Sequence, residues 1–170
     1  MDSFEIKGGT PLYGEVEISG AKNAVLPILA ATLLTREPCV IRRVPDLEDV
    51  RTMCLILESL GATTKIEKDV VTVQAAKVGE FADYDLVRKM RASICVLGPL
   101  LARMKKATVS MPGGCLIGTR PVDLHRKAMM ALGAKVAIKG GYITARARKL
   151  VGGEMFLGGR SGPTVLGTAN

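Results

Sequence analysis

Aromatic side chains and histidine are the scarcest chemical groups in this chain of 170 residues. It contains no tryptophan, three phenylalanines, three tyrosines and one histidine. Proteins that bind single-stranded nucleic acid stack bases on aromatic side chains and cluster their basic residues. The lysines and arginines here are scattered, so nucleic acid is not the expected partner. One histidine also leaves little from which to build a metal site, and we expect neither a metal nor a cofactor.

Cysteine pairs and long apolar runs are also missing. None of the four cysteines forms a CxxC pair, and Cys39, Cys54 and Cys95 lie in apolar patterns typical of small buried thiols. The longest apolar run, residues 24–34, contains a proline and is too short to cross a bilayer. Residues 1–8 contain two acids where a secretion signal needs basic residues. We therefore expect a cytoplasmic protein without a membrane partner.

The composition is that of a globular protein with an excess of positive charge. Hydrophobic residues make up 48% of the chain, charged residues make up 24%, and the formal net charge is +8. This charge favours an anionic partner, and small phosphorylated ligands fit a chain with few aromatic residues. The alternative hypothesis is a basic module that binds nucleotides or nucleic acid without catalysis.

The strongest internal pattern is a repeat with an offset of 72 residues. LGA at 60–62 returns at 132–134, and PILA at 27–30 corresponds to PLLA at 99–102. Self-similarity at a fixed spacing marks a repeated structural unit. The repeat predicts two β-α-β-α-β-β units, at about 16–75 and 84–146, followed by the start of a third.

Hydrophobic periodicity predicts the elements of each unit. The helices over 23–34 and 92–102 are apolar on all sides, so we expect them in the interior with the sheets outside. The first unit is predicted as strand 16–19, helix 23–34, strand 39–44, helix 47–60 and two strands. The second is predicted as helix 86–104 with a kink at Pro99, strand 108–111, a helix from about Pro121 and two strands.

The two copies differ most at MPGGCLIGTRPVDLH, residues 111–125. The interval from Pro27 to Pro45 is 18 residues, and the matching interval that ends at Pro121 is 22. The next interval, to the glycine that ends the helix, falls from 16 to 12. The second copy therefore lengthens a strand–helix connection by about four residues and shortens the next helix by about one turn. Such a local change is typical of a site added to a scaffold.

This longer connection contains a candidate reactive thiol. Cys115 lies between Gly114 and Leu116, five residues before Arg120 and just ahead of a helix start. Open, positive surroundings favour a reactive thiolate. The first copy has Val44 where the second has Arg120, and an arginine beside free helix N–H groups forms an anion site. A redox role for the thiol is a further hypothesis, although the loop has no second cysteine.

The junction at residues 19–23, SGAKN, shows a similar pattern. Gly20 allows a tight turn, and Asn23 can cap the helix or bind a ligand. Lys22 at a helix N-terminus opposes the helix dipole, so a bound phosphate or carboxylate is one expected compensation, and solvation is the other. From the residues alone, Arg91 is typical of a surface charge and His125 of a structural histidine.

Three stretches carry a resemblance to a known family: ISGAKNAVLPIL (18–29), YDLVRKMRASICVLGPLLAR (84–103) and the 111–125 segment. The chain resembles the UDP-N-acetylglucosamine enolpyruvyl transferases along essentially its whole length. The related 5-enolpyruvylshikimate-3-phosphate synthases lack the cysteine loop. The resemblance implies an inside-out α/β barrel of two domains, each with three β-α-β-α-β-β units. Residues 1–21 would pair with the second domain, and 22–170 would form an incomplete first domain.

The resemblance also implies a reaction and its residues. The enolpyruvyl group of phosphoenolpyruvate passes to the 3-hydroxyl of UDP-N-acetylglucosamine with release of phosphate, in the first committed step of peptidoglycan precursor synthesis. Cys115 would donate a proton to the methylene carbon and is the thiol that fosfomycin alkylates. Lys22 and Arg120 would hold phosphate and carboxylate. The implied nucleotide-sugar contacts are Asn23, Arg91, Arg120, Pro121, Val122, Asp123, Leu124, His125, Gly167 and Thr168.

Part of the implied active site belongs to sequence beyond Asn170. In the family, an aspartate base and a further phosphate-binding arginine come from the second domain. That domain is therefore an expected partner, and we expect the 170-residue chain to hold half of a cleft and to be inactive alone.

Overall fold

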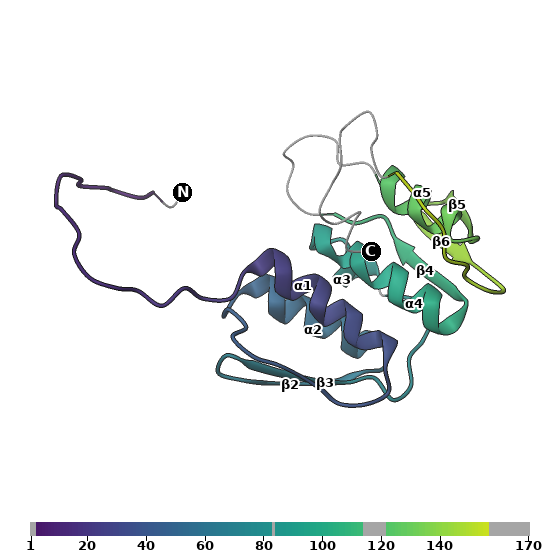
Figure 1. Ribbon diagram of the computed structural model, residues 1–170, viewed down its shortest axis with the longest axis horizontal. Helices are drawn as coiled ribbons and strands as arrows, with labels where there is room; N and C mark the ends of the chain where they lie inside the picture. The colour runs from purple at the N-terminus through teal and green to yellow at the C-terminus, as the bar shows by residue number, and fades with distance from the viewer. Residues whose placement is uncertain (1–2, 83, 114–121, 157–170) are drawn as a thin grey trace.

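The computed structural model describes residues 3–82, 84–113 and 122–156. In space, α1 (Lys22–Ala31), α2 (Glu48–Ser59) and α4 (Leu97–Met104) lie between two three-stranded antiparallel sheets (Figure 1). No helix among the described residues is long and apolar enough to cross a membrane.

The first unit runs from helix to sheet in the predicted order. It consists of α1 (Lys22–Ala31), the 3-10 turn η1 (Thr32–Leu34), β1 (Cys39–Ile41), α2 (Glu48–Ser59), β2 (Thr63–Glu67) and β3 (Val70–Gln74). The strand order is β1-β3-β2.

The second unit has the same topology. It consists of α3 (Tyr84–Val87), the 3-10 helix η2 (Arg91–Val96), α4 (Leu97–Met104), β4 (Lys106–Ser110), α5 (Asp123–Ala131), β5 (Lys135–Lys139) and β6 (Tyr142–Arg146). Its strand order is β4-β6-β5. The repeat read from the sequence is therefore confirmed.

The glycines of the repeated LGA motif end the two amphipathic helices. Gly61 after α2 and Gly133 after α5 have left-handed φ angles of 99° and 89°. Their N–H groups donate to the carbonyls of Glu58 and Met130, at 2.8 and 3.0 Å. This left-handed position favours glycine because it lacks a Cβ, which is why both helices end where the sequence predicts.

One continuous apolar core joins the two units. Arg103 on α4 adds polar contacts between them: its guanidinium donates to the carbonyls of Leu33 and Thr35 at 2.8 and 3.0 Å, and to that of Ala76 at 3.0 Å. The largest fully buried side chains are Leu29, Leu33, Met53, Ile56, Leu57, Leu60, Val71, Ile94, Leu97, Leu100, Leu101 and Ile143.

The two apolar helices differ in burial. The η2–α4 segment is buried almost throughout, as predicted. The prediction for 23–34 was wrong on one face, because Ile28 and Leu34 are 49% and 54% exposed. In the part of the chain that the structure describes, no element packs over that face of α1.

The predicted continuous helix over 86–104 is broken. Met90 is extended, with φ −141° and ψ 136°, so α3 ends at Val87 and η2 begins at Arg91. The buried Ser93 hydroxyl lies within hydrogen-bond distance of the carbonyl oxygens of Val87 and Met90, at 2.8 and 2.6 Å. Pro99 lies in the first turn of α4, where a missing N–H costs little, so it does not kink a longer helix.

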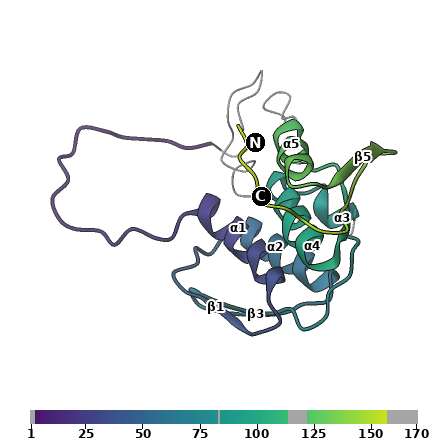
Figure 2. The same ribbon diagram turned by 45° about the vertical axis from the view of Figure 1, so that its right-hand side comes forward.

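The strand predicted over 16–19 does not form within the described residues. Val16 and Ile18 are 84% and 72% exposed, and the N-terminal segment runs away from the helices and sheets in two views (Figures 1 and 2). Its link to the body is Arg43, whose guanidinium donates to the Ile18 carbonyl at 3.0 Å. In the second unit, the segment before the first helix does pair with the sheet, through one parallel bridge between Phe81 and Thr108. A single bridge is too short to be predicted from a hydrophobic pattern.

The strand registers correct the length of the unusual connection. Val73 pairs with Cys39, and the residue 72 positions later, Ala145, pairs with Ala107. Pro45 follows Cys39 by six residues, whereas Pro121 follows Ala107 by fourteen. The connection after the strand is therefore eight residues longer in the second unit, not about four. The interval between prolines understated the difference, because it also includes the link before the strand, which is four residues shorter in the second unit. The one-turn shortening is confirmed, since α2 has 12 residues and α5 has 9.

Replacing Ser93 by alanine tests the cause of the helix break. Ser93→Ala leaves two buried carbonyls without the hydroxyl, so we expect a loss of about 1–3 kcal/mol in the free energy of unfolding. Urea denaturation followed by circular dichroism measures it. Ser59→Ala is the control, because the Ser59 hydroxyl donates only to Ile56, at 2.8 Å near the end of α2. Equal losses in the two variants would contradict this account.

Candidate functional site

The structure describes part of the site predicted from the sequence. Cys115, Arg120, Pro121, Gly167 and Thr168 lie outside the described residues. The predicted residues inside them come from three segments: Lys22 and Asn23 at the start of α1, Arg91 at the start of η2, and Val122, Asp123, Leu124 and His125 at the start of α5. Helix α1 packs against η2, and His125 is electrostatically coupled to Arg91 and Asp123.

Lys22 has a partner within the chain. Its ammonium Nζ lies 2.9 Å from Oδ2 of Asp49, which is in the first turn of α2. The first turn of α1 contains no acid and Ala21 provides no side-chain cap, so Asp49 supplies the nearby negative charge that the helix start lacks. The sequence predicted a compensating anion, but it gave no reason to choose Asp49, since an acid in the first turn of a helix is ordinary.

The start of α1 is fixed by a close approach at Gly20. A Cβ at this position would lie 1.9 Å from the carbonyl oxygen of Arg43, so a side chain cannot fit without moving backbone. Arg43 itself has a left-handed φ of 59° just after β1. The glycine therefore sets where α1, and with it Lys22, begins relative to the first sheet.

A second close approach lies where the cysteine loop leaves β4. A Cβ at Gly113 would lie 1.7 Å from the carbonyl oxygen of Arg88, in the turn between α3 and η2. Glycine is thus required at the last described residue before the loop. In the first unit the glycine precedes the helix and the arginine follows the strand, whereas in the second unit these positions are exchanged.

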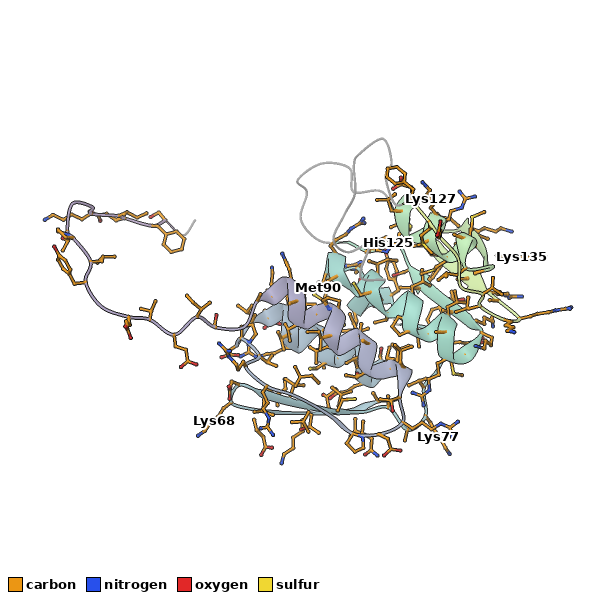
Figure 3. All side chains as sticks on the ribbon, viewed as in Figure 1. Lys68, Lys77, Met90, His125, Lys127 and Lys135 are labelled. Atoms are coloured by element: carbon orange, nitrogen blue, oxygen red, sulfur yellow. The ribbon has the colours of Figure 1, made fainter. Side chains whose placement is uncertain are left out.

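His125 is a buried, neutral side chain on α5 (Figure 3). It is 2% exposed, and burial, followed by the nearby Arg91 guanidinium, lowers its pKa from 6.5 to about 4 against an opposing effect of Asp123. At neutral pH the imidazole therefore carries no charge, and Arg91 contributes the positive charge of this pair. The burial of His125 agrees with its interpretation as a structural histidine.

Exposure separates the remaining candidates into two kinds. Asn23 and Asp123 are exposed, so their side chains can reach a ligand. Val122 and Leu124 are 5% and 4% exposed, so ligand contact at these residues falls mainly to the backbone. The start of α5 thus combines one exposed carboxylate with two buried apolar residues.

The other cysteines differ in burial. Burial raises the pKa of Cys95 to about 11, with Arg91 opposing, and it also raises the pKa of Cys54. Both thiols are protonated at neutral pH and pack as small apolar groups, as predicted. Cys39 is only partly buried, and its thiol donates to the carbonyl of Glu37 at 3.7 Å.

The pKa of His125 leads to a prediction on stability. The unfolded chain binds a proton at His125 below pH 6.5, whereas the folded chain does so only near pH 4. The folded state therefore loses about 3 kcal/mol through this group as the pH falls from 6.5 to 4. Urea unfolding at several pH values should show that His125→Gln lacks this part of the loss. Parallel stability curves for the variant and the unaltered chain would contradict it.

The close approach at Gly113 leads to a second prediction on stability. Gly113→Ala places a methyl group against the Arg88 backbone, so we expect a loss of about 1–3 kcal/mol and a shift of the loop entrance. Gly152→Ala is the control, since nothing lies within 4 Å of its added Cβ. Thermal unfolding compares them, and a Gly113 variant as stable as the control would refute the contact.

Comparison with known proteins identifies relatives along the whole chain. Residues 6–158 match the model of the family described as EPSP synthase (3-phosphoshikimate 1-carboxyvinyltransferase). The UDP-N-acetylglucosamine 1-carboxyvinyltransferases of Methylacidiphilum infernorum and Akkermansia muciniphila are 55% and 52% identical over 100% of this chain. That of Helicobacter pylori is 55% identical over 92%. The chain spans only 38–40% of the length of these relatives.

A solved structure supports the fold. The enolpyruvyl transferase NikO from Streptomyces tendae matches 84% of this chain, and 32% of its own, with a TM-score of 0.70 and 24% identity. At this identity the likeness concerns the fold alone, and it agrees with helices packed between the sheets of repeated units. The family match and the repeated architecture lead to one conclusion: the chain belongs to the EPSP synthase family.

Proposed function

We propose that this chain provides one part of a UDP-N-acetylglucosamine 1-carboxyvinyltransferase. The observation that carries the proposal is the 52–55% identity, along the whole chain, to relatives with that name. The reaction transfers the enolpyruvyl group of phosphoenolpyruvate to the 3-hydroxyl of the sugar and releases phosphate. Both substrates are small anions, which suits the net charge of +8, and we place the protein in the cytoplasm.

Cys115 is the proposed proton donor to the methylene carbon of phosphoenolpyruvate. The glycine close approach two residues earlier supports this role, because it fixes the point at which the loop begins. A donor that also acts as a nucleophile works best with a pKa near the working pH. Nearby cationic groups, such as the lysine and arginine assigned to this site, favour the thiolate form that the nucleophilic role requires.

Lys22 and Arg120 are the proposed groups that bind the phosphate and carboxylate. Positive charges placed in advance stabilise the negative charge that leaves with phosphate. The place of Lys22 at the first turn of α1 supports this role, since its ammonium and the helix N–H groups attract the same anion. Its present carboxylate partner, Asp49, is itself an anion at this position.

The nucleotide sugar is proposed to lie along the starts of α1, η2 and α5. Asn23 and Asp123 have exposed side chains, and Arg91 provides a positive charge for the diphosphate. His125 is proposed to support Arg91 from below. Pro121, Val122, Leu124, Gly167 and Thr168 complete the proposed contacts.

The rest of the cleft is proposed to come from a second domain. Residues 1–21 are assigned to it, and residues 22–170 to an incomplete first domain. The exposed apolar side chains of the N-terminal segment support this assignment: Phe4, Ile6, Leu12, Tyr13 and Val16 are each more than 80% exposed. A row of exposed apolar residues along an extended segment is typical of a strand that pairs elsewhere.

Phosphate release from phosphoenolpyruvate and UDP-N-acetylglucosamine tests the function. The protein encoded by the intact gene should turn over, and the 170-residue chain alone should not. Cys115→Ser should lower kcat by about 100-fold or more, because it removes the proton donor. Cys39→Ser is the matched control and should leave kcat unchanged.

Fosfomycin labelling gives an independent readout. Mass spectrometry should find the adduct on Cys115 only, and UDP-N-acetylglucosamine should promote it. Absence of both turnover and labelling in the intact gene's protein would refute the proposal. Salt-sensitive binding to nucleic acid that is indifferent to Cys115 would then favour the basic binding module.

A further inference from the structure

We propose that Asp49 is an internal competitor for Lys22, which an anionic substrate must displace from the ammonium. The inference deepens the proposed function, because it assigns to Asp49 the setting of affinity for the phosphate-bearing substrate. Asp49 acts through its ion pair with Lys22 and does not contact the reacting atoms in this proposal.

The arrangement of two helix starts brings this pair together. Helices α1 and α2 pack side by side, as both ribbon views show (Figures 1 and 2). Lys22 is the first residue of α1, and Asp49 is the second residue of α2. The ammonium lies at the positive end of one helix dipole, where it is disfavoured, and the carboxylate lies at the positive end of another, where it is favoured. The helix dipoles thus favour the charge of Asp49 and disfavour that of Lys22, which its ion pair with Asp49 offsets.

The neighbouring acids have a different partner. Arg51 forms ion pairs with Asp46 and, at 3.5 Å, with Glu48. Asp49 instead lies 2.9 Å from the Lys22 ammonium. Asp46 and Glu48 therefore pair with Arg51, and Asp49 pairs with Lys22.

The pair is exposed enough to exchange partners. The Lys22 and Asp49 side chains are 49% and 37% exposed. Because water screens such a pair, its formation changes an equilibrium constant by a factor of about five at most. Lysine is a compact charge on a flexible stem, so it can turn to another anion without moving the helix. A phosphate dianion has more charge to offer than one carboxylate and is therefore able to replace Asp49.

Displacement has a cost that the substrate must meet. Lys22 still interacts partly with Asp49 when the anion binds, so its attraction for the anion is weaker. The nearby carboxylate also repels the anion. Asp49 therefore holds the ammonium in place before binding while it lowers affinity for the anion that binds Lys22. Removing its charge should tighten anion binding.

Two neutral substitutions in one helix turn test this proposal. Asp49→Asn and Glu48→Gln, made in the protein from the intact gene, remove the same charge from adjacent residues, and only Asp49 contacts Lys22. Asp49→Asn should lower KM for phosphoenolpyruvate and the Kd of inorganic phosphate about two- to fivefold relative to Glu48→Gln. KM for UDP-N-acetylglucosamine should not change. In a Lys22→Met background, Asp49→Asn should have a smaller effect on phosphate binding, because only the repulsion by the Asp49 carboxylate is then removed.

Each other outcome overturns the proposal. Equal changes in both variants would mean that only long-range charge matters, and weaker anion binding in Asp49→Asn would mean that Asp49 orients Lys22 for the substrate. Asp49→Ser provides a second neutral variant if the asparagine variant does not fold. Binding of inorganic phosphate is measured by calorimetry without turnover, so failure of the carboxyvinyl transfer reaction is distinguishable from failure of this inference.

Discussion

Burial of the η2–α4 segment is the constraint on which the described structure depends. This segment packs against α1 and η1 of the first unit and against β4 and β6 of the second, so its apolar side chains complete the core of both. Two of its polar side chains bind backbone carbonyls: Ser93 bonds to the segment before the break, and Arg103 to the first unit. Each unit therefore relies on the other for its interior.

The same segment connects the core to the site. Arg91 begins η2, and its guanidinium acts on both Cys95, one turn further along, and the buried His125. Burial keeps both groups neutral, although Arg91 opposes it at Cys95 and adds to it at His125, so the positive charge of this group lies on Arg91. Arg91 is partly buried, and its charge is therefore screened less by water than that of a fully exposed arginine.

Features that depend on local pattern were predictable from the sequence. The repeat, the glycines that end α2 and α5, and the buried η2–α4 segment follow from spacing and residue type. The break at Met90 was not predictable, because it depends on hydrogen bonds from Ser93 to backbone groups. The candidate loop was located by comparing the two copies, but the Lys22–Asp49 pair joins residues 27 positions apart and required the packing of two helices.

The glycine lies before the helix at one junction and after the strand at the other, which bears on how two repeats can diverge. Gly20 against Arg43 and Arg88 against Gly113 are analogous close approaches, each between the segment before a helix and the segment after a strand of its unit. The steric requirement is therefore one glycine for each close approach, and either chain segment can satisfy it. A duplicated unit can thus place its glycine on either segment and keep a side chain on the other, without a change in the core.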